Sequence, residues 1–275
     1  MLDKPEANSP EMLCTMALIG TSILPGEAVL PFWLMLRHTP LLPALGLTSA
    51  FALGAWGLRA VSFGGAIAGL LLTVLVSLAA GPPGFLAVLL LFVLTFLATR
   101  FGYAQKQRSG TAERKRGRNS MQVLANLGPA SMTVAPLLLW RPLAHVLLAG
   151  FVAAVAEAAA DTVSSELGQV LSPRKAYLIT NLERVDCGRD GGVSFAGCVA
   201  ALLVSATICA FCQWLDLLLP RWFWLATLSG FAGMLLDSVL GATVERPGRL
   251  GNNSVNFVSG AFSAFVAILL AFLFR

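Results

Sequence analysis

The stretch AEAAADTVSSELG, residues 156–168, ends an apolar run with charged and hydroxyl side chains. Its first half has the composition of a membrane helix, yet Glu157 lies inside that half, and Asp161, Ser165 and Glu166 follow it. Glu157, Asp161 and Ser165 recur every four residues, so they share one face if the stretch is helical. Because a carboxylate that faces lipid is costly, we expect this face to point into a helix bundle or a water-filled cavity.

The composition of the whole chain indicates a membrane protein. The 275 residues are 57% hydrophobic and only 12% charged, whereas soluble domains carry about 25% charged residues. The formal net charge of +5 is then mainly a property of the loops. Basic loops of membrane proteins usually report topology, so we expect membrane lipids and no nucleic acid as partners.

Nine apolar segments are candidate membrane spans. The predicted fold class is therefore all-α, a polytopic transmembrane helical bundle of about nine spans. The first segment is interrupted by Pro25 and Glu27, and the second is short. The predicted spans are residues 13–36, 42–58, 63–80, 83–99, 121–140, 143–160, 194–214, 220–237 and 256–274.

The loops between these spans predict which side of the membrane they face. The longest basic stretch is RFGYAQKQRSGTAERKRGRN, residues 100–119, which should be cytoplasmic by the positive-inside rule. The polar loops 161–193 and 238–255 each follow after two further crossings, so all three loops fall on one face. The sequence therefore predicts a polar active-site cleft at the cytoplasmic face.

Two predicted span ends carry an aspartate followed by a hydroxyl residue and a valine. The sequences are ADTVSSELG at 160–168 and LDSVLGATVE at 236–245. Carboxylates from different segments that meet at one face supply the hard oxygen ligands that Mg²⁺ prefers, with substrate phosphates and water completing its shell. Asp161, Glu166 and Asp237 are therefore the predicted metal ligands and candidate catalytic residues.

This metal prediction depends on local helix geometry. Asp161 and Glu166 are about 140° apart on a continuous helix, so both reach one ion only if the helix ends near Gly168 or breaks there. Alternatively, Asp161 and Asp237 could cap helices or pair with loop arginines, and Glu157 could pair with a buried partner.

Other polar residues in the predicted loops suit a phosphate. The segment GRDGG, residues 188–192, could present backbone N–H groups without a Cβ in the way, and Arg118 and Arg189 could add forked donors. The simpler alternatives are that the glycines only shape a turn, the asparagines cap a helix and the basic stretch only sets topology. The asparagines that could contact phosphate, ribose or base are Asn252, Asn253 and Asn256.

Several established mechanisms are excluded by what the chain lacks. Its two histidines, His38 and His145, cannot build a histidine-cluster zinc site, and no GxxxxGK[ST] phosphate-binding loop is present. The five cysteines imply no disulfide framework, and CAFC at 209–212 is read as two small apolar residues within a membrane span. A nucleotide would have to be held in another way.

The motifs taken together resemble one family. RNSMQVLAN (118–126), ADTVSSELG (160–168), GGVSFAG (191–197), LDSVLGATVE (236–245) and NNSVNF (252–257) occur in its order and spacing. The family is the integral membrane family called domain of unknown function 92, to which the plant plastid phytyl-phosphate kinase belongs. The resemblance covers roughly residues 55–275. It implies a multi-span enzyme that phosphorylates an isoprenyl monophosphate to the diphosphate, with CTP as co-substrate and Mg²⁺.

The resemblance also implies a set of binding residues. The sequence departs from the family's usual pattern at Val163, Arg189 and Glu245, and Arg189 could alter the choice of nucleotide or substrate. By matching motif, the substrate- and nucleotide-binding residues are Arg118, Asn119, Gln122, Asn126, Thr162, Ser165, Gly191, Gly192, Ser194, Ser238, Gly241, Asn252, Asn253 and Asn256. Arg189 is added as a phosphate-binding residue on the chemistry of its side chain, and Asp161, Glu166 and Asp237 are the metal ligands predicted above.

The sequence leaves four functions in competition. The leading hypothesis is phosphoryl transfer from a nucleoside triphosphate to a phytyl or geranylgeranyl monophosphate. The alternatives are a lipid cytidylyltransferase or lipid-alcohol kinase, a transporter or flippase of a lipid or prenyl phosphate, and a scaffold without chemistry.

Two further expectations concern organisation and location. Residues 1–40 form an N-terminal segment with a possible extra membrane helix, and residues 41–275 form the transmembrane catalytic domain. No plastid transit segment is recognised, so we expect a prokaryotic plasma membrane.

Overall fold

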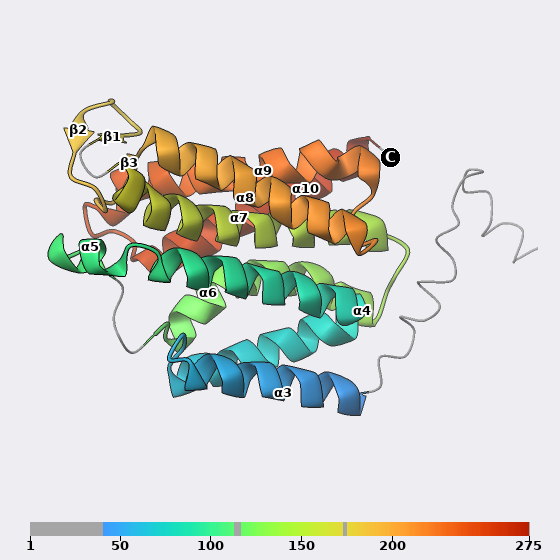
Figure 1. Ribbon diagram of the computed structural model, residues 1–275. Helices are drawn as coiled ribbons and strands as arrows, with labels where there is room; N and C mark the ends of the chain where they lie inside the picture. The colour runs from blue at the N-terminus through green and yellow to red at the C-terminus, as the bar shows by residue number, and fades with distance from the viewer. Residues whose placement is uncertain (1–40, 113–116, 173–174, 275) are drawn as a thin grey trace, which may run out of the picture. The chain divides into compact units, whose positions relative to one another are not determined.

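The computed structural model describes residues 41–112, 117–172 and 175–274, which belong to one compact unit, Thr39–Arg275. The predicted N-terminal segment 1–40, including the predicted span 13–36, lies outside the described residues. Nearly all of the described elements are helices (Figure 1). The main helices are α3 (Leu41–Gly57), α4 (Phe63–Arg100), α5 (Tyr103–Arg108), α6 (Ser120–Val134), α7 (Ala144–Leu171), α8 (Phe195–Trp214), α9 (Phe223–Leu240) and α10 (Asn252–Leu273).

The prediction of an all-α membrane protein is confirmed. Among the described residues, five helical segments are long and apolar enough to cross a membrane, and the helix α3 is apolar but shorter. Helix α6 continues into the short turn η2 (Ala135–Leu138), and η3 (Pro220–Trp222) leads into α9. The five segments are Phe63–Arg100, Ala144–Leu171, Phe195–Trp214, Pro220–Glu245 and Asn252–Leu273.

Helix α4 is folded back on itself. Gly81 has the non-helical angles φ 72° and ψ −170°, and Pro82 and Pro83, which have no backbone N–H, follow it. The far end of α4 returns to its start, because Arg100 Nη2 donates a 3.2 Å hydrogen bond to the carbonyl of Leu58. The two halves of α4 therefore correspond to the two predicted spans 63–80 and 83–99.

Helix α7 is the central element of the bundle. It packs against α4, α6, α8, α9 and α10, and 89% of the residues in its most apolar stretch are buried. Small residues allow this close packing. A Cβ at Gly230 of α9 would lie only 2.9 Å from the Cβ of Ala156, and one at Gly233 only 2.6 Å from Cγ of Glu157. The face of α7 that carries Glu157 is therefore enclosed by other helices, as predicted from the sequence.

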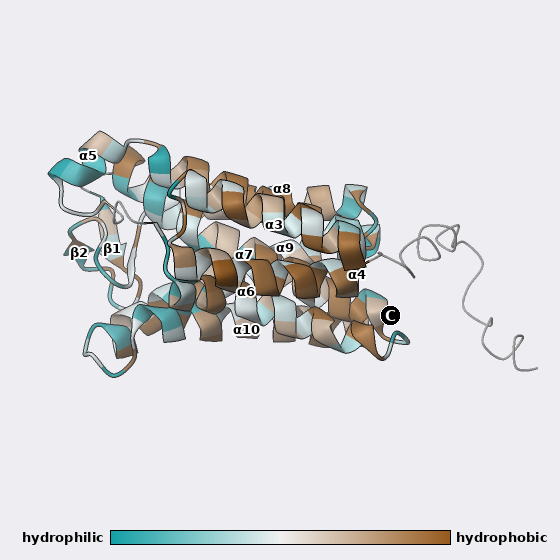
Figure 2. Cartoon of the chain, turned by 90° about the horizontal axis from the view of Figure 1, so that it is seen from below, coloured by the Kyte–Doolittle hydropathy of each residue, from teal (hydrophilic) through white to brown (hydrophobic). Residues whose placement is uncertain are grey.

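One end of the bundle is hydrophilic. The α4–α6, α7–α8 and α9–α10 loops all emerge at this end (Figure 1), where polar residues gather around α5 and the strands (Figure 2). Close contacts at glycines join the loops, since a Cβ at Gly188 would lie 2.8 Å from Cγ2 of Thr111 and one at Gly241 would lie 2.8 Å from the amide nitrogen of Gly191. The three predicted polar loops thus lie together.

A small sheet shapes the α7–α8 loop. Strands β1 (Ala176–Leu178), β2 (Arg184–Val185) and β3 (Gly192–Val193) pair antiparallel in the order β2-β1-β3. The register pairs Tyr177 with Arg184 on one side and with Val193 on the other. The turn between β2 and β3 carries Arg189 toward the end of α9, which continues into a π-helical turn, η4 (Gly241–Glu245).

Candidate active site

A polar cleft at the hydrophilic end consists of two adjoining cavities. The loop cavity, about 150 Å³, lies at the α7–α8 loop, and the α6 cavity, about 170 Å³, lies beside α6. Asp161, Ser165 and Asn252 line both. The other predicted residues in the loop cavity are Arg189, Gly191, Gly192, Ser194, Asp237, Ser238 and Gly241. Those in the α6 cavity are Arg118, Gln122, Asn126, Thr162, Glu166 and Asn256.

Carboxylates from two helices meet in the cleft. Asp161 on α7 and Asp237 on α9 line the loop cavity and interact electrostatically. One turn deeper on α7, buried Glu157 accepts a 2.7 Å hydrogen bond from Ser259 Oγ, and this hydroxyl lies 3.3 Å from Asp237 Oδ2. A hydroxyl has one proton, so Ser259 serves one of these carboxylates at a time. The two aspartates are therefore backed by a third carboxylate below the cleft.

Glu166, the third predicted metal ligand, lines the α6 cavity together with Asp161. Helix α7 continues past Gly168 to Leu171, so this occurs without the helix break that the prediction required. The Glu166 carboxylate forms an ion pair with Lys106 of α5. Within the described residues, no three His, Cys, Asp or Glu side chains are grouped closely enough to hold a metal by themselves. Asp161 and Asp237 are the two predicted metal ligands that share the loop cavity.

The start of α6 holds Arg118 against the cleft. Arg118 exchanges backbone hydrogen bonds with Ala60 and Ser62, and its Nη2 donates a 3.1 Å hydrogen bond to Thr162 Oγ1 on α7. Gly117, with φ 69°, lies so close to the backbone of Ala60 that a Cβ would collide with it. This glycine therefore allows the approach that carries Arg118 between the α3–α4 connection and Asp161, with which it interacts electrostatically.

Several of the predicted polar residues form hydrogen bonds within helix caps, helices or turns. Asn119 caps α6 and forms a reciprocal capping box with Gln122, and Ser194 caps α8 by accepting from the amide of Gly197. The amide of Gly192 donates to the carbonyl of Arg189 in a turn, and Ser238 donates to the carbonyl of Met234. Asn119 lines neither cavity. In this structure the N–H of Gly192 is therefore engaged and not open to a phosphate.

The asparagines of α10 are divided between two roles. Asn252 and Glu245 line the loop cavity together, and Asn256 Nδ2 lies 3.4 Å from Oδ1 of Asn126. Asn253 lines neither cavity. The Oδ1 of Asn256 is buried and has no hydrogen-bond partner among the described residues. It is an acceptor that a bound cation or a donor group of a ligand would satisfy.

Gly191 is required by the packing of the loop. Its φ of 76° is in the left-handed region, and a Cβ there would lie within 2.6 Å of Cα of Ala242. The loop therefore rests directly on the start of η4. This contact brings Arg189 to the cavity that Asp237 lines.

Sequence reasoning missed some residues of the cleft. Lys106 and Ser259, which bond to Glu166 and Glu157, were not predicted, and neither were Asp190 and Glu245, which line the loop cavity. A sequence signal existed for Ser259, because Asn252, Asn256 and Ser259 share one face of a helix at spacings of four and three. Lys106 gave no such signal, since it lies in a run of basic residues.

The fold and the cleft define a class: an integral membrane protein of helices, with aspartates, arginines and amides gathered at one end of the bundle. The chain belongs to the family described as integral membrane protein DUF92, whose family model matches residues 46–264. No solved structure matches this chain.

Three relatives extend the comparison. The chain is 30% identical to protein VTE6, chloroplastic, of Arabidopsis thaliana over 76% of this chain and 65% of that protein. It is 32% identical to protein PGR of the same plant, over 81% of this chain and 93% of the relative. It is 34% identical to the uncharacterized membrane protein MJ0933 of Methanocaldococcus jannaschii, over 65% of this chain and 72% of that protein. The chain thus spans slightly less than two thirds of the first relative's length.

Proposed function

We propose that this protein is a membrane-embedded isoprenyl-phosphate kinase. It transfers the terminal phosphoryl group of a nucleoside triphosphate, with CTP as the expected donor, to phytyl or geranylgeranyl monophosphate. The observation that carries the proposal is the cleft in which Asp161 and Asp237 lie with Arg118 and Arg189 at one end of an apolar bundle. Membership of the DUF92 family supports the same reaction class.

The reaction needs positioning more than proton transfer. An oxygen of the acceptor's phosphate attacks the γ-phosphorus, the bond from that phosphorus to the bridging oxygen breaks, and the nucleoside diphosphate leaves. The acceptor phosphate is already anionic, so no strong general base is required. Arg118 and Arg189 would hold phosphate oxygens and neutralise the charge that spreads over the transferring group.

The cleft fits a Mg²⁺ ion that is held mainly by its substrate. Mg²⁺ is usually bound through one or two carboxylates, several waters and substrate phosphates. Asp161 and Asp237 supply the carboxylates, and the buried Oδ1 of Asn256 is an unused acceptor. When bound, the ion would neutralise part of the triphosphate charge.

We also propose the orientation. The basic residues of the α4–α6 loop favour a cytoplasmic location for the hydrophilic end, with nine spans in the whole chain and the protein in a prokaryotic plasma membrane. A nucleoside triphosphate from the cytoplasm would then reach the cleft directly, while the apolar tail of the acceptor stays in the bilayer.

The test is an assay of purified protein in liposomes that contain geranylgeranyl monophosphate. Mg²⁺ is supplied together with CTP, ATP, GTP or UTP in turn, and mass spectrometry measures the product. We expect the diphosphate with the native protein, its loss when the metal is chelated, and a fall of about 100-fold or more in the folded Asp161→Asn variant. Asp216→Asn is the matched control, because Asp216 is exposed and lines neither cavity.

Other products would identify the rivals. A cytidine diphosphate adduct would indicate a lipid cytidylyltransferase. Movement of labelled prenyl phosphate between leaflets without nucleotide consumption would indicate a flippase. Full activity in a well-folded Asp161→Asn protein would show that the cleft is not the active site.

A further inference from the structure

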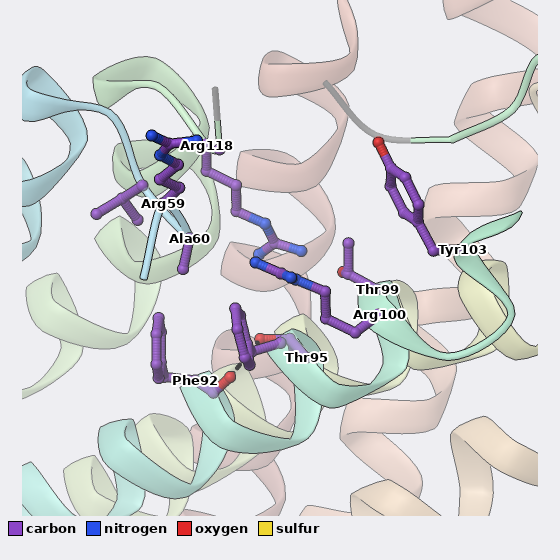
Figure 3. Close-up of a pocket in the computed structure, with 11 residues that line it drawn as sticks. Arg59, Ala60, Phe92, Thr95, Thr99, Arg100, Tyr103 and Arg118 are labelled. Carbon is purple, nitrogen blue, oxygen red and sulfur yellow. Dashed lines mark hydrogen bonds between the residues drawn. The ribbon is translucent and has the colours of Figure 1, made fainter. Parts of the chain in front are cut away.

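A further cavity, outside the cleft, also has Arg118 among its lining residues. This arginine cavity, about 320 Å³, is lined by Arg59, Arg100 and Arg118, together with Phe92, Phe96 and Tyr103. Figure 3 shows the guanidinium groups of Arg100 and Arg118 pointing toward each other across it. Neither the metal site nor the nucleotide site proposed above uses Arg59 or Arg100.

The arginine cavity concentrates positive charge. Arg100 Nη2 donates to the carbonyl of Leu58, and its guanidinium lies 4.8 Å from the ring centre of Phe96. Within the part of the chain that the structure describes, Arg59 and Arg100 form no ion pair with a carboxylate. Like charges that converge on a cavity are stabilised by an anion, and arginine suits a phosphate because its planar fork binds two oxygens at once.

The backbone at Arg59 supports a functional role for this cavity. Arg59 has φ 56°, a left-handed conformation that is uncommon for residues other than glycine. Such conformations cost free energy and persist where the surrounding structure maintains them, often at binding sites. Here the bonds of the 58–62 turn to Arg100 and Arg118 maintain it.

An apolar groove continues from the arginine cavity into the bundle. The α3–α4–α6 groove, about 90 Å³, is lined by apolar residues of these three helices, among them Phe51, Gly69 and Leu91. Val61, Phe92, Thr95 and Arg118 line both the cavity and the groove, so the two adjoin. The result is a cationic head site joined to an apolar channel, which has room for only the first part of a long tail.

We propose that the arginine cavity and the α3–α4–α6 groove bind a lipid phosphate monoester with a single tail, whose phosphate lies between Arg100 and Arg118. This inference rests on the proposed function and deepens it by giving the acceptor its own site. Arg118 also contacts Thr162 in the cleft, so the acceptor phosphate would lie next to the aspartates. An acceptor phosphate in the arginine cavity and a nucleotide in the cleft would meet at Arg118, because this residue lines both.

The test measures binding of geranylgeranyl monophosphate to the full chain in detergent, without nucleotide, by isothermal titration. We expect Arg100→Gln to weaken binding about 10-fold or more, as the loss of charge-assisted hydrogen bonds predicts. Arg221→Gln is the matched control, because Arg221 also lies over an aromatic ring, Trp222 at 5.1 Å, and lines neither site. Thermal melting verifies that each variant is folded.

A second pair of variants tests the groove. A Cβ at Gly69 would make only an ordinary 3.9 Å contact with Val123, so a leucine there can be built and would fill the groove. We expect Gly69→Leu to weaken binding of geranylgeranyl monophosphate about 10-fold and to leave binding of methyl phosphate, which has no tail to place in the groove, unchanged. Gly46→Leu, at an exposed α3 position with nothing within 4 Å, should change neither.

The outcomes separate this inference from the proposed function. Native-like binding by both Arg100→Gln and Gly69→Leu would overturn the acceptor site, even if the kinase assay succeeds. Inorganic phosphate and phosphatidylglycerol are each added as competitors of geranylgeranyl monophosphate. If inorganic phosphate binds as tightly as the prenyl phosphate, the cavity is a free-phosphate site. If phosphatidylglycerol binds as tightly, it is a lipid-headgroup site, and either result would overturn the acceptor site. Arginine- and groove-dependent binding without any phosphoryl transfer would uphold the site and contradict the kinase.

Discussion

Lys106 shows how one residue can connect the membrane helices to the cleft. Its side chain is 1% exposed, and its Nζ donates to the carbonyls of Ala98 and Thr99 at the end of α4 and pairs with Glu166 of α7. Three acceptors thus surround one ammonium group. Two of them are carbonyls of the last turn of α4, which have no partner within the helix.

Replacing Lys106 by methionine should destabilise the protein. The substitution keeps the volume but leaves Glu166 and two carbonyls without their donor, and breaking a buried ion pair typically costs about 3–5 kcal/mol. Thermal melting in detergent should fall clearly for Lys106→Met. It should hardly change for Gln107→Met, an exposed neighbour on α5. Equal melting temperatures for the two variants would show that the ion pair contributes little.

Single residues of the cleft were predictable to different degrees. Asp161 and Asp237 could be found because each follows an apolar run that has no other reason to hold a carboxylate. The ion pair of Glu166 could not be predicted, because its partner, Lys106, is 60 residues away and carries no local signal. Asn119 and Ser194 fit a binding site and a helix cap equally well in sequence, and the structure makes both of them caps.

At the scale of elements, glycines decide where loops meet helices. Gly191 and Gly248 have nearly the same φ, 76° and 78°, but only Gly191 touches another element, the start of η4. The backbone cost of an alanine is therefore similar at the two positions, and only the steric consequence differs. This pair isolates the contribution of the loop contact from that of backbone strain.

Gly191→Ala should impair the cleft, whereas Gly248→Ala should not. The added Cβ would push the α7–α8 loop away from Ala242 and shift Arg189, and a displacement of about 1 Å can reduce turnover about 100-fold. Steady-state kinetics of diphosphate formation measure the effect. If both alanine variants lose the same activity, strain and not loop contact is responsible.

The elements themselves were predictable where they are long and apolar. The two halves of α4 were separated correctly because Gly81, Pro82 and Pro83 interrupt the apolar pattern. The short helix α5 and the strands β1 to β3 were not predicted, since they are six residues or fewer and depend on contacts with distant segments. The continuation of α7 to Leu171 was also missed, because its last turns are polar and resemble a loop.

At the scale of the whole described unit, the three polar loops form one surface. Sequence reasoning anticipated this from an even number of crossings between the loops, and it did not require a correct span at the N-terminus. The cleft then follows from the topology, because α7, α9 and α10 carry the residues Asp161, Asp237 and Asn252 to the same end.

Accessibility of single cysteines would test the orientation. In a variant whose own cysteines are replaced by alanine, Leu139→Cys at the α6–α7 turn should react with an impermeant maleimide added to intact cells. Ser109→Cys beside α5 should react only after lysis. Both native side chains are exposed. The native cysteines are replaced because they could also react with the maleimide. Burial raises the pKa of the Cys187 thiol and so slows its reaction, but does not abolish it. The reverse labelling pattern would invert the orientation.

The central claim is that the cleft transfers a terminal phosphoryl group to a lipid phosphate. The most direct measurement follows the label from CTP that carries ³²P at either the γ- or the α-phosphate, with the native protein in liposomes containing geranylgeranyl monophosphate. We predict that γ-label enters the extracted lipid, that α-label does not, and that the Asp161→Asn protein transfers neither. Label from the α-phosphate in the lipid, or no label from either nucleotide, would contradict the account.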